Sequence, residues 1–172
     1  MAKRLINDIY FKKIIKKKIN MINCMFELNG KLTSTFKCGA KSFPAFSGYG
    51  KHLNRLISAC LAGEGPIPPG TYYIFDRQSG GLLGSFYDMF NDHSDWFALH
   101  AVDMKIDDVT YCNKVKRGAF RLHPKGMRGI SEGCITIEKK SDFHFLRTIL
   151  RGNTPIAVPG STLKAYGTVV VR

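Results

Sequence analysis

The sequence lacks any long hydrophobic run. None of its 172 residues lie in a segment that approaches the roughly 18 consecutive apolar residues of a membrane helix, so we expect no membrane span. Hydrophobic residues make up 44% and aromatic residues 12% of the chain, which excludes a protein that is disordered by composition. No internal repeat is present, which excludes a solenoid or a propeller.

Cysteine pairs at metal-site spacing are also lacking. The five cysteines form no C-x-x-C pair, which argues against a zinc ribbon or a thioredoxin motif. Their odd number leaves at least one thiol unpaired in a monomer. Asp92, His93 and Asp95 match no metal-ligand spacing, so we expect a surface loop there, with no metal and no cofactor. The pairing of the other four cysteines stays open: Cys24, Cys38, Cys60 and Cys112.

Acidic residues are few, and the chain carries a net charge of +13. Much of this charge lies in residues 1–20, where lysines interrupt every apolar run, so we expect no secretory signal peptide. Two interpretations remain for this segment: a basic arm for anionic partners, or a dispensable extension with the natural start at Met21. We favour the second, with residues 21–172 as a single domain.

From Met21 onward the pattern is that of a β protein. Asn29-Gly30 is a strong signal for a two-residue type I′ hairpin turn. Period-two alternation and β-branched or aromatic content predict strands. The expected strands are 22–28, 31–38, 71–75, 96–102, 118–123, 134–138, 155–158 and 167–172. Turn-rich composition predicts loops at 43–50, 65–70 and 76–84, and 51–60 fits a short helix or an irregular connection.

One helix is expected, over residues 141–151. Ser141 is the candidate N-cap, Asp142 lies in the first turn, and Gly152 is the stop. An apolar stripe follows the helical period: Phe143, Leu146, Ile149 and Leu150. The predicted fold class is mainly β, a sandwich or barrel with one packed α-helix near the C-terminus.

The residues with the clearest chemistry lie in the segment 121–137. His123 ends one expected strand and Cys134 opens the next, so strands ending at one rim would bring them together. Cysteine attacks as the thiolate, and a neighbouring imidazole can take its proton and return it to a leaving amine. The amides of Gly133 and Cys134 are candidate oxyanion donors, and Ser131 can support the loop. The alternative is a loop histidine beside an inert buried cysteine.

This segment resembles the catalytic signature of L,D-transpeptidases, a His, a spacer, and Ser/Thr-His-Gly-Cys followed by an apolar residue. Three motifs more closely resemble the type VI secretion L,D-transpeptidase effector family: FPAFSG at 43–48, GPIPPGTY at 65–72 and SEGCITI at 131–137. The resemblance covers residues 21–172.

The resemblance implies an enzyme that acts on peptidoglycan stem peptides. Cys134 would be the acylated nucleophile and His123 the base, with Ser131 and Gly133 matching the motif. The cysteine would expel the terminal D-residue of a tetrapeptide, after which water, a free D-amino acid or a second stem would take the acyl group. The resemblance also implies a toxin that is made in the bacterial cytoplasm, delivered by the secretion machine to the target periplasm, and matched by an immunity protein.

Two departures from the L,D-transpeptidase signature affect the expected reaction. Glu132 replaces the motif's second histidine, and the spacer between His123 and Cys134 is short. We therefore expect carboxypeptidase trimming and D-amino-acid exchange rather than crosslinking.

Three residues are candidates for binding the carboxylates of a stem peptide: Tyr49, Lys51 and Arg77. For each of them a solvated surface position is the alternative. A competing function is a basic module that binds nucleic acid or cell wall without catalysis. No nucleic-acid motif is present, so we expect no nucleic-acid partner. The acceptor and the oligomeric state stay open.

Overall fold

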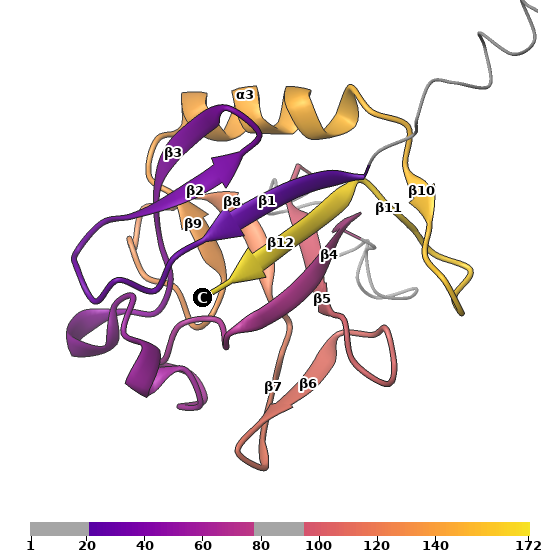
Figure 1. The fold of residues 1–172 in the computed structure, drawn as a ribbon. Helices are drawn as coiled ribbons and strands as arrows, with labels where there is room; N and C mark the ends of the chain where they lie inside the picture. Colours follow the sequence, from indigo (N-terminus) through magenta and orange to yellow (C-terminus); the bar gives the residue numbers. More distant parts are fainter. Residues whose placement is uncertain (1–20, 78–94) are drawn as a thin grey trace, which may run out of the picture.

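The computed structural model describes residues 21–77 and 95–172. Eight of its strands form a closed barrel in the order β1-β12-β4-β5-β8-β9-β3-β2 (Figure 1). Their bounds are β1 Ile22–Phe26, β2 Ser34–Cys38, β3 Lys41–Phe46, β4 Gly70–Asp76, β5 Phe97–Ala101, β8 Arg121–Pro124, β9 Ile135–Ile137 and β12 Gly167–Val171. The predicted mainly-β class is confirmed.

The described residues also form two small hairpins and two short 3-10 segments outside the barrel. The hairpins are β6 Val109–Cys112 with β7 Val115–Gly118, and β10 Ile156–Ala157 with β11 Lys164–Ala165. The 3-10 segments η1 Gly50–His52 and η2 Leu56–Ser58 fill the expected irregular region. A disulfide between Cys60 and Cys112 fastens the connection after η2 to the end of β6. It thereby ties two distant parts of the chain together.

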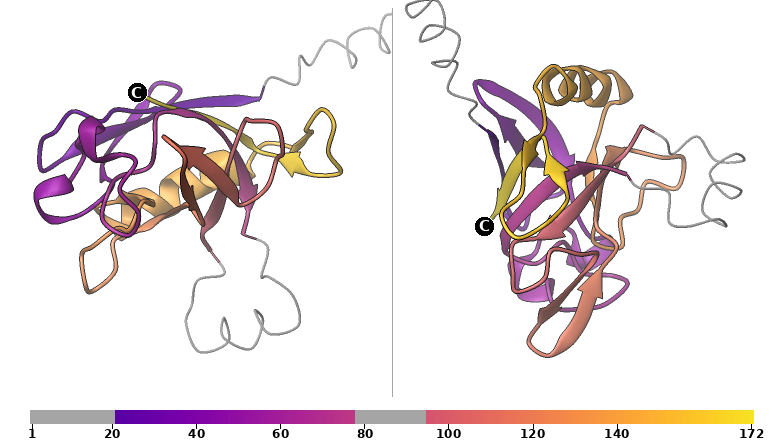
Figure 2. Two further views of the ribbon diagram at one scale, coloured as in Figure 1. Left: turned by 90° about the horizontal axis from the view of Figure 1, so that it is seen from below. Right: turned by 90° about the vertical axis from the view of Figure 1, so that its right-hand side faces the viewer.

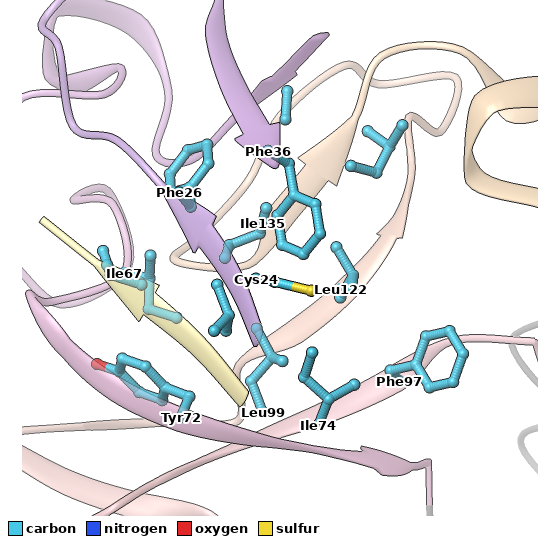
Figure 3. Packing of buried hydrophobic residues seen from close by; sticks show 14 of the residues in the cluster. Cys24, Phe26, Phe36, Ile67, Tyr72, Ile74, Phe97, Leu99, Leu122 and Ile135 are labelled. Carbon is cyan, nitrogen blue, oxygen red and sulfur yellow. The ribbon is translucent and has the colours of Figure 1, made fainter. Parts of the chain in front are cut away.

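The barrel closes because β1 pairs in parallel with β12 and antiparallel with β2. Apolar side chains from alternating strand positions fill the interior, and Figure 3 shows several of them meeting there. Among those with no exposed surface are Phe26, Phe36, Ile74, Leu122 and Ile135. Burial of such side chains stabilises the fold by roughly 1.5–3 kcal/mol each.

The helix α3 spans Lys140–Arg151 and packs against β8 and β9. Figures 1 and 2 show it at one end of the barrel, with the β6–β7 hairpin at the other. Its buried residues are Phe143, Leu146 and Leu150, as the apolar stripe predicts. The predicted N-cap at Ser141 is wrong: Lys139 holds that position without a side-chain cap. No helix among the described residues has the length and apolarity needed to cross a membrane.

The hairpin of β1 and β2 forms, but the predicted two-residue turn at 29–30 is wrong. β1 ends at Phe26 and β2 begins at Ser34, so residues 27–33 make a longer loop between them. Its conformation depends on distant contacts: Gly30 N–H donates to Asn54 O at 2.7 Å, and Asn54 Nδ2 donates to Lys31 O at 2.9 Å. Contacts with Asn54, which is distant in sequence, therefore determine the conformation of this loop.

Two further predictions need correction. Residues 43–46 of the expected loop belong to β3, where exposed Pro44 accepts a hydrogen bond from Glu138 N–H at 2.9 Å while Phe43 and Ala45 are buried. The expected strand 118–123 is interrupted, because the backbone of Ala119 has φ +54° and separates β7 from β8. The predicted loop at 76–84 lies outside the described residues from 78 onward.

Candidate active site

The candidate catalytic residues lie on the parallel pair of β8 and β9. In this pair Leu122 is opposite Ile135 and His123 is opposite Thr136. Leu122 and Ile135 belong to the core, so alternation places His123 and Thr136 on the other face of the pair. Cys134 precedes Thr136 by two residues and therefore belongs to the same face as His123. The strand pairing thus brings His123 and Cys134 to one face. Cys134 lies two residues before Thr136, the residue opposite His123.

His123 is held by hydrogen bonds at both ring nitrogens. Nδ1 lies 2.8 Å from the carbonyl oxygen of Pro124, and Nε2 lies 3.3 Å from Thr136 Oγ1. A carbonyl oxygen only accepts, so Nδ1 carries the proton in the neutral ring. Nε2 then carries the unprotonated electron pair, which accepts from the Thr136 hydroxyl and is the position where a general base takes up a proton.

One aromatic ring stacks on this histidine, and a guanidinium lies over that ring. The ring of Trp96 lies parallel to that of His123, with centroids 4.2 Å apart and an angle of 18° between the planes. The guanidinium of Arg77 lies 5.7 Å from the Trp96 ring centroid. Arg77, a predicted substrate-binding residue, is thus brought to the His123 side of the site. The sequence reasoning gave Trp96 no role, although it is the chain's one tryptophan and directly precedes β5.

The Cys134 side chain is partly exposed, and its thiol lies among opposing charges. Its Sγ is 3.9 Å from the carbonyl oxygen of Ala119. Burial raises the pKa of the thiol, while the backbone N–H and the positive charge of Arg121 act to lower it. Arg121 is itself fixed by two 2.7 Å hydrogen bonds to Asp108, whose negative charge acts in the raising direction. The resting cysteine is therefore a thiol that needs a base.

The turn before Cys134 depends on glycine and serine. Gly133 has φ +123°, and a Cβ there would lie 2.8 Å from Arg117 Nη2 and 2.9 Å from the ring of Phe120. Buried Ser131 donates from Oγ to the carbonyl oxygen of Cys134 at 2.6 Å. Glycine is thus required at 133 on both conformational and steric grounds.

Arg117 connects this turn to the proline-rich loop. It is buried and donates to the carbonyl oxygens of Ala59, Gly65 and Pro66. Burial lowers the pKa of its guanidinium. Sequence reasoning gave Arg117 no role, because in a basic chain an arginine is typical of the surface.

The other predicted binding residues are placed elsewhere. Tyr49 N–H donates to Glu64 O at 3.2 Å, and Lys51 is exposed in η1. Within the described residues, no hydrogen bond or ion pair joins either of them to His123 or Cys134.

The residues weighed as metal ligands do not form a centre in the described part of the chain. Asp95 makes an ion pair with Arg147 at 2.6 Å, and Asp92 and His93 lie outside the described residues. Within residues 21–77 and 95–172, no group of three metal-ligating side chains is present.

A cysteine and a histidine on one face of neighbouring strands, beside a strained glycine turn, form a site suited to a cysteine nucleophile. The comparison with family models agrees with this class: residues 41–161 match the Tlde1 domain, and the chain belongs to this family of type VI secretion L,D-transpeptidase effectors. The matched range includes β3 to β10 and contains both His123 and Cys134. No curated protein and no solved structure matches the chain.

Membership of this family supports the predicted function at a coarse level. It implies a type VI secretion effector with L,D-transpeptidase-type activity, directed at peptidoglycan.

Proposed function

We propose that the protein is a cysteine-dependent L,D-carboxypeptidase and D-amino-acid-exchanging L,D-transpeptidase of peptidoglycan stem tetrapeptides. Cys134 is the nucleophile and His123 is the base. The observation that carries the proposal is the register of β8 and β9, which puts both residues on one face while Pro124 O orients the imidazole.

The first half-reaction transfers the stem peptide to the enzyme. His123 Nε2 takes the thiol proton, and Cys134 Sγ attacks the carbonyl carbon of the third stem residue. The amides of Gly133 and Cys134 are the candidate donors to the oxyanion. The carbon–nitrogen bond then breaks, His123 returns the proton to the amine of the departing D-residue, and a thioester remains on Cys134.

The second half-reaction depends on the acceptor. Water yields the tripeptide and completes a carboxypeptidase cycle, whereas the amine of a free D-amino acid restores a tetrapeptide with a new terminal residue. In both cases His123 takes a proton from the acceptor and returns it to the departing thiolate. The short spacer before Cys134 favours these small acceptors over a second stem.

Substrate binding uses the cationic side of the site. We expect Arg77, whose guanidinium lies over the Trp96 ring that stacks on His123, to meet a stem carboxylate as the peptide enters. Tyr49 and Lys51 remain predicted contacts of the same anionic substrate.

The cellular setting follows from the family and from cysteine chemistry. A disulfide between Cys60 and Cys112 is favoured in an oxidising compartment, which fits action in the target periplasm. We propose delivery by a type VI machine, a cognate immunity protein in the producing cell, and a catalytic domain at 21–172 to which residues 1–20 are dispensable.

Mass spectrometry of a purified tetrapeptide muropeptide tests the reaction type. In ¹⁸O water we expect loss of the terminal D-alanine with one heavy oxygen in the new tripeptide carboxylate. Addition of D-methionine is expected to give a tetrapeptide with that residue in place of D-alanine. Cleavage at another bond, or an unchanged muropeptide with folded protein, would contradict the proposal.

A further inference from the structure

Two cysteines outside the candidate site lie directly opposite each other in the barrel wall. Cys24 of β1 and Cys38 of β2 are paired in the antiparallel register. Both belong to the hydrophobic core, with 4% and 3% of their surface exposed. Figure 3 shows the Cys24 side chain among the core residues. Neither residue has a part in the proposed reaction at Cys134.

The geometry of this pair suits a covalent link. Directly opposed residues of an antiparallel ladder have Cα atoms about 4.5–5.5 Å apart. This range falls within the roughly 4.4–6.8 Å that disulfides span. Both side chains belong to the hydrophobic core and come from directly opposed positions, so they lie side by side on the inner face of the ladder.

We propose that Cys24 and Cys38 form a second disulfide of this protein when it is exposed to a thiol-oxidising environment. The site is a modification site within the barrel wall, distinct from the Cys60–Cys112 bond and from the proposed nucleophile. The proposal does not depend on the enzymatic function.

The bond forms by exchange with the disulfide of a small molecule or an oxidoreductase. Interaction with Cys24 lowers the pKa of Cys38, whereas interaction with Cys38 and burial raise the pKa of Cys24. In the proposed exchange the first attack is therefore that of Cys38 as the thiolate. Its sulfur bonds to one sulfur of the oxidant and expels the other as a thiolate. Cys24 then loses its proton and attacks the Cys38 sulfur, which expels the second oxidant thiolate. The protein loses two protons and two electrons, and the oxidant's disulfide is reduced.

The location gives the bond a structural consequence. β1 is the strand that closes the barrel against β12, and β2 connects through β3 to β9. A bond between Cys24 and Cys38 would fix the closing strand to the part of the wall that adjoins Cys134. Both sulfur atoms are buried, so exchange needs the ladder to open or occurs during folding.

The test is disulfide mapping of the full chain. The protein is unfolded and reduced, refolded in a buffer of oxidised and reduced glutathione, quenched with iodoacetamide under denaturing conditions, and digested. We expect a linked peptide pair containing Cys24 and Cys38, a second pair containing Cys60 and Cys112, and an alkylated Cys134. Alkylated Cys24 and Cys38 in a sample whose Cys60–Cys112 bond has formed would overturn the proposal.

A matched variant lacks the Cys60–Cys112 bond, so these two cysteines cannot exchange with Cys24 or Cys38. In Cys60→Ala/Cys112→Ala, the Cys24–Cys38 pair is still expected to form under the same redox buffer. A circular dichroism spectrum like that of the wild type verifies that this variant is folded. Links from Cys24 or Cys38 to Cys134 in the folded variant, in place of the expected pair, would count against the proposal.

Discussion

At the residue scale, Cys134 lies between the charges of Arg121 and Asp108. The positive charge of Arg121 favours the thiolate, and the negative charge of Asp108 disfavours it. Because only the thiolate is alkylated, the pH dependence of alkylation reports the thiol's pKa. Burial predicts that the rate at Cys134 rises at a higher pH than for an ordinary cysteine.

Substitutions at the two residues of this ion pair should shift the pH dependence of Cys134 alkylation in opposite directions. Arg121→Gln is expected to raise the pKa of Cys134, and Asp108→Asn is expected to lower it. The rate of iodoacetamide labelling of Cys134, followed by peptide mass spectrometry from pH 6 to 11, measures both. Shifts in the same direction would show that loss of structure, and not charge, dominates.

Trp96 is the residue whose removal should most affect His123 without touching the reacting atoms. Trp96→Leu removes the stacked ring, so the imidazole is expected to lose its fixed orientation and kcat to fall by about 10-fold to 100-fold. Trp96→Phe keeps an aromatic surface and should retain most of the activity. The release of D-alanine as a function of pH measures both variants, and a Leu variant as active as wild type would exclude this positioning role.

The candidate reacting residues could be predicted from the sequence, whereas their supporting residues could not. His123, Ser131, Gly133 and Cys134 fall within one local motif whose residue types have a chemical meaning. Trp96, Arg117 and Arg121 acquire their importance through contacts with residues distant in the chain. A single sequence carries no signal for such contacts.

At the element scale, the turn before β9 depends on Gly133, whose backbone conformation and close neighbours disfavour any side chain. Gly133→Ala adds a Cβ to a backbone with φ +123° and against Arg117 and Phe120, so we expect a loss of about 1–3 kcal/mol in unfolding free energy. Gly126→Ala, in the same loop, meets no atom within 4 Å and serves as the matched control. Urea unfolding of both variants measures the difference, and equal losses would contradict the steric argument.

Sequence patterns best predict those elements whose secondary structure is determined by their own side chains. The stripe of α3 and the β-rich segments of β4 and β5 were predicted to within one or two residues at most ends. The turn at Asn29-Gly30 and the strand around Pro44 were not, because Asn54 shapes the former and pairing with β2 and β9 defines the latter. In both segments tertiary contacts determine the structure and override local propensity.

At the scale of the whole molecule, the Cys60–Cys112 bond closes a long loop. The two cysteines are 52 residues apart in sequence, and the chain-entropy model assigns such a bond about 4 kcal/mol of stability. Cys60→Ser/Cys112→Ser is therefore expected to unfold at a clearly lower urea concentration than wild type. Wild type after reduction should match the variant, and an unchanged midpoint in both would contradict this role for the bond.

The mainly-β class could be predicted from composition and turn signals, but the closure of the barrel could not. Closure rests on parallel pairing of Ile22–Phe26 with Gly167–Val171, the first and last strands of the described residues, and no local pattern links segments so far apart. The pairing of β8 with β9, which brings His123 near the Cys134 turn, joins neighbouring segments and is more local than the closure of the barrel.

In the proposed reaction the thiol of Cys134 carries the chemistry. The most direct test compares D-alanine release from one tetrapeptide muropeptide by wild type and by Cys134→Ala, with circular dichroism verifying that both are folded. We expect release by wild type and a fall of at least about 1,000-fold in the variant. Release by Cys134→Ala at a rate close to that of wild type would contradict it.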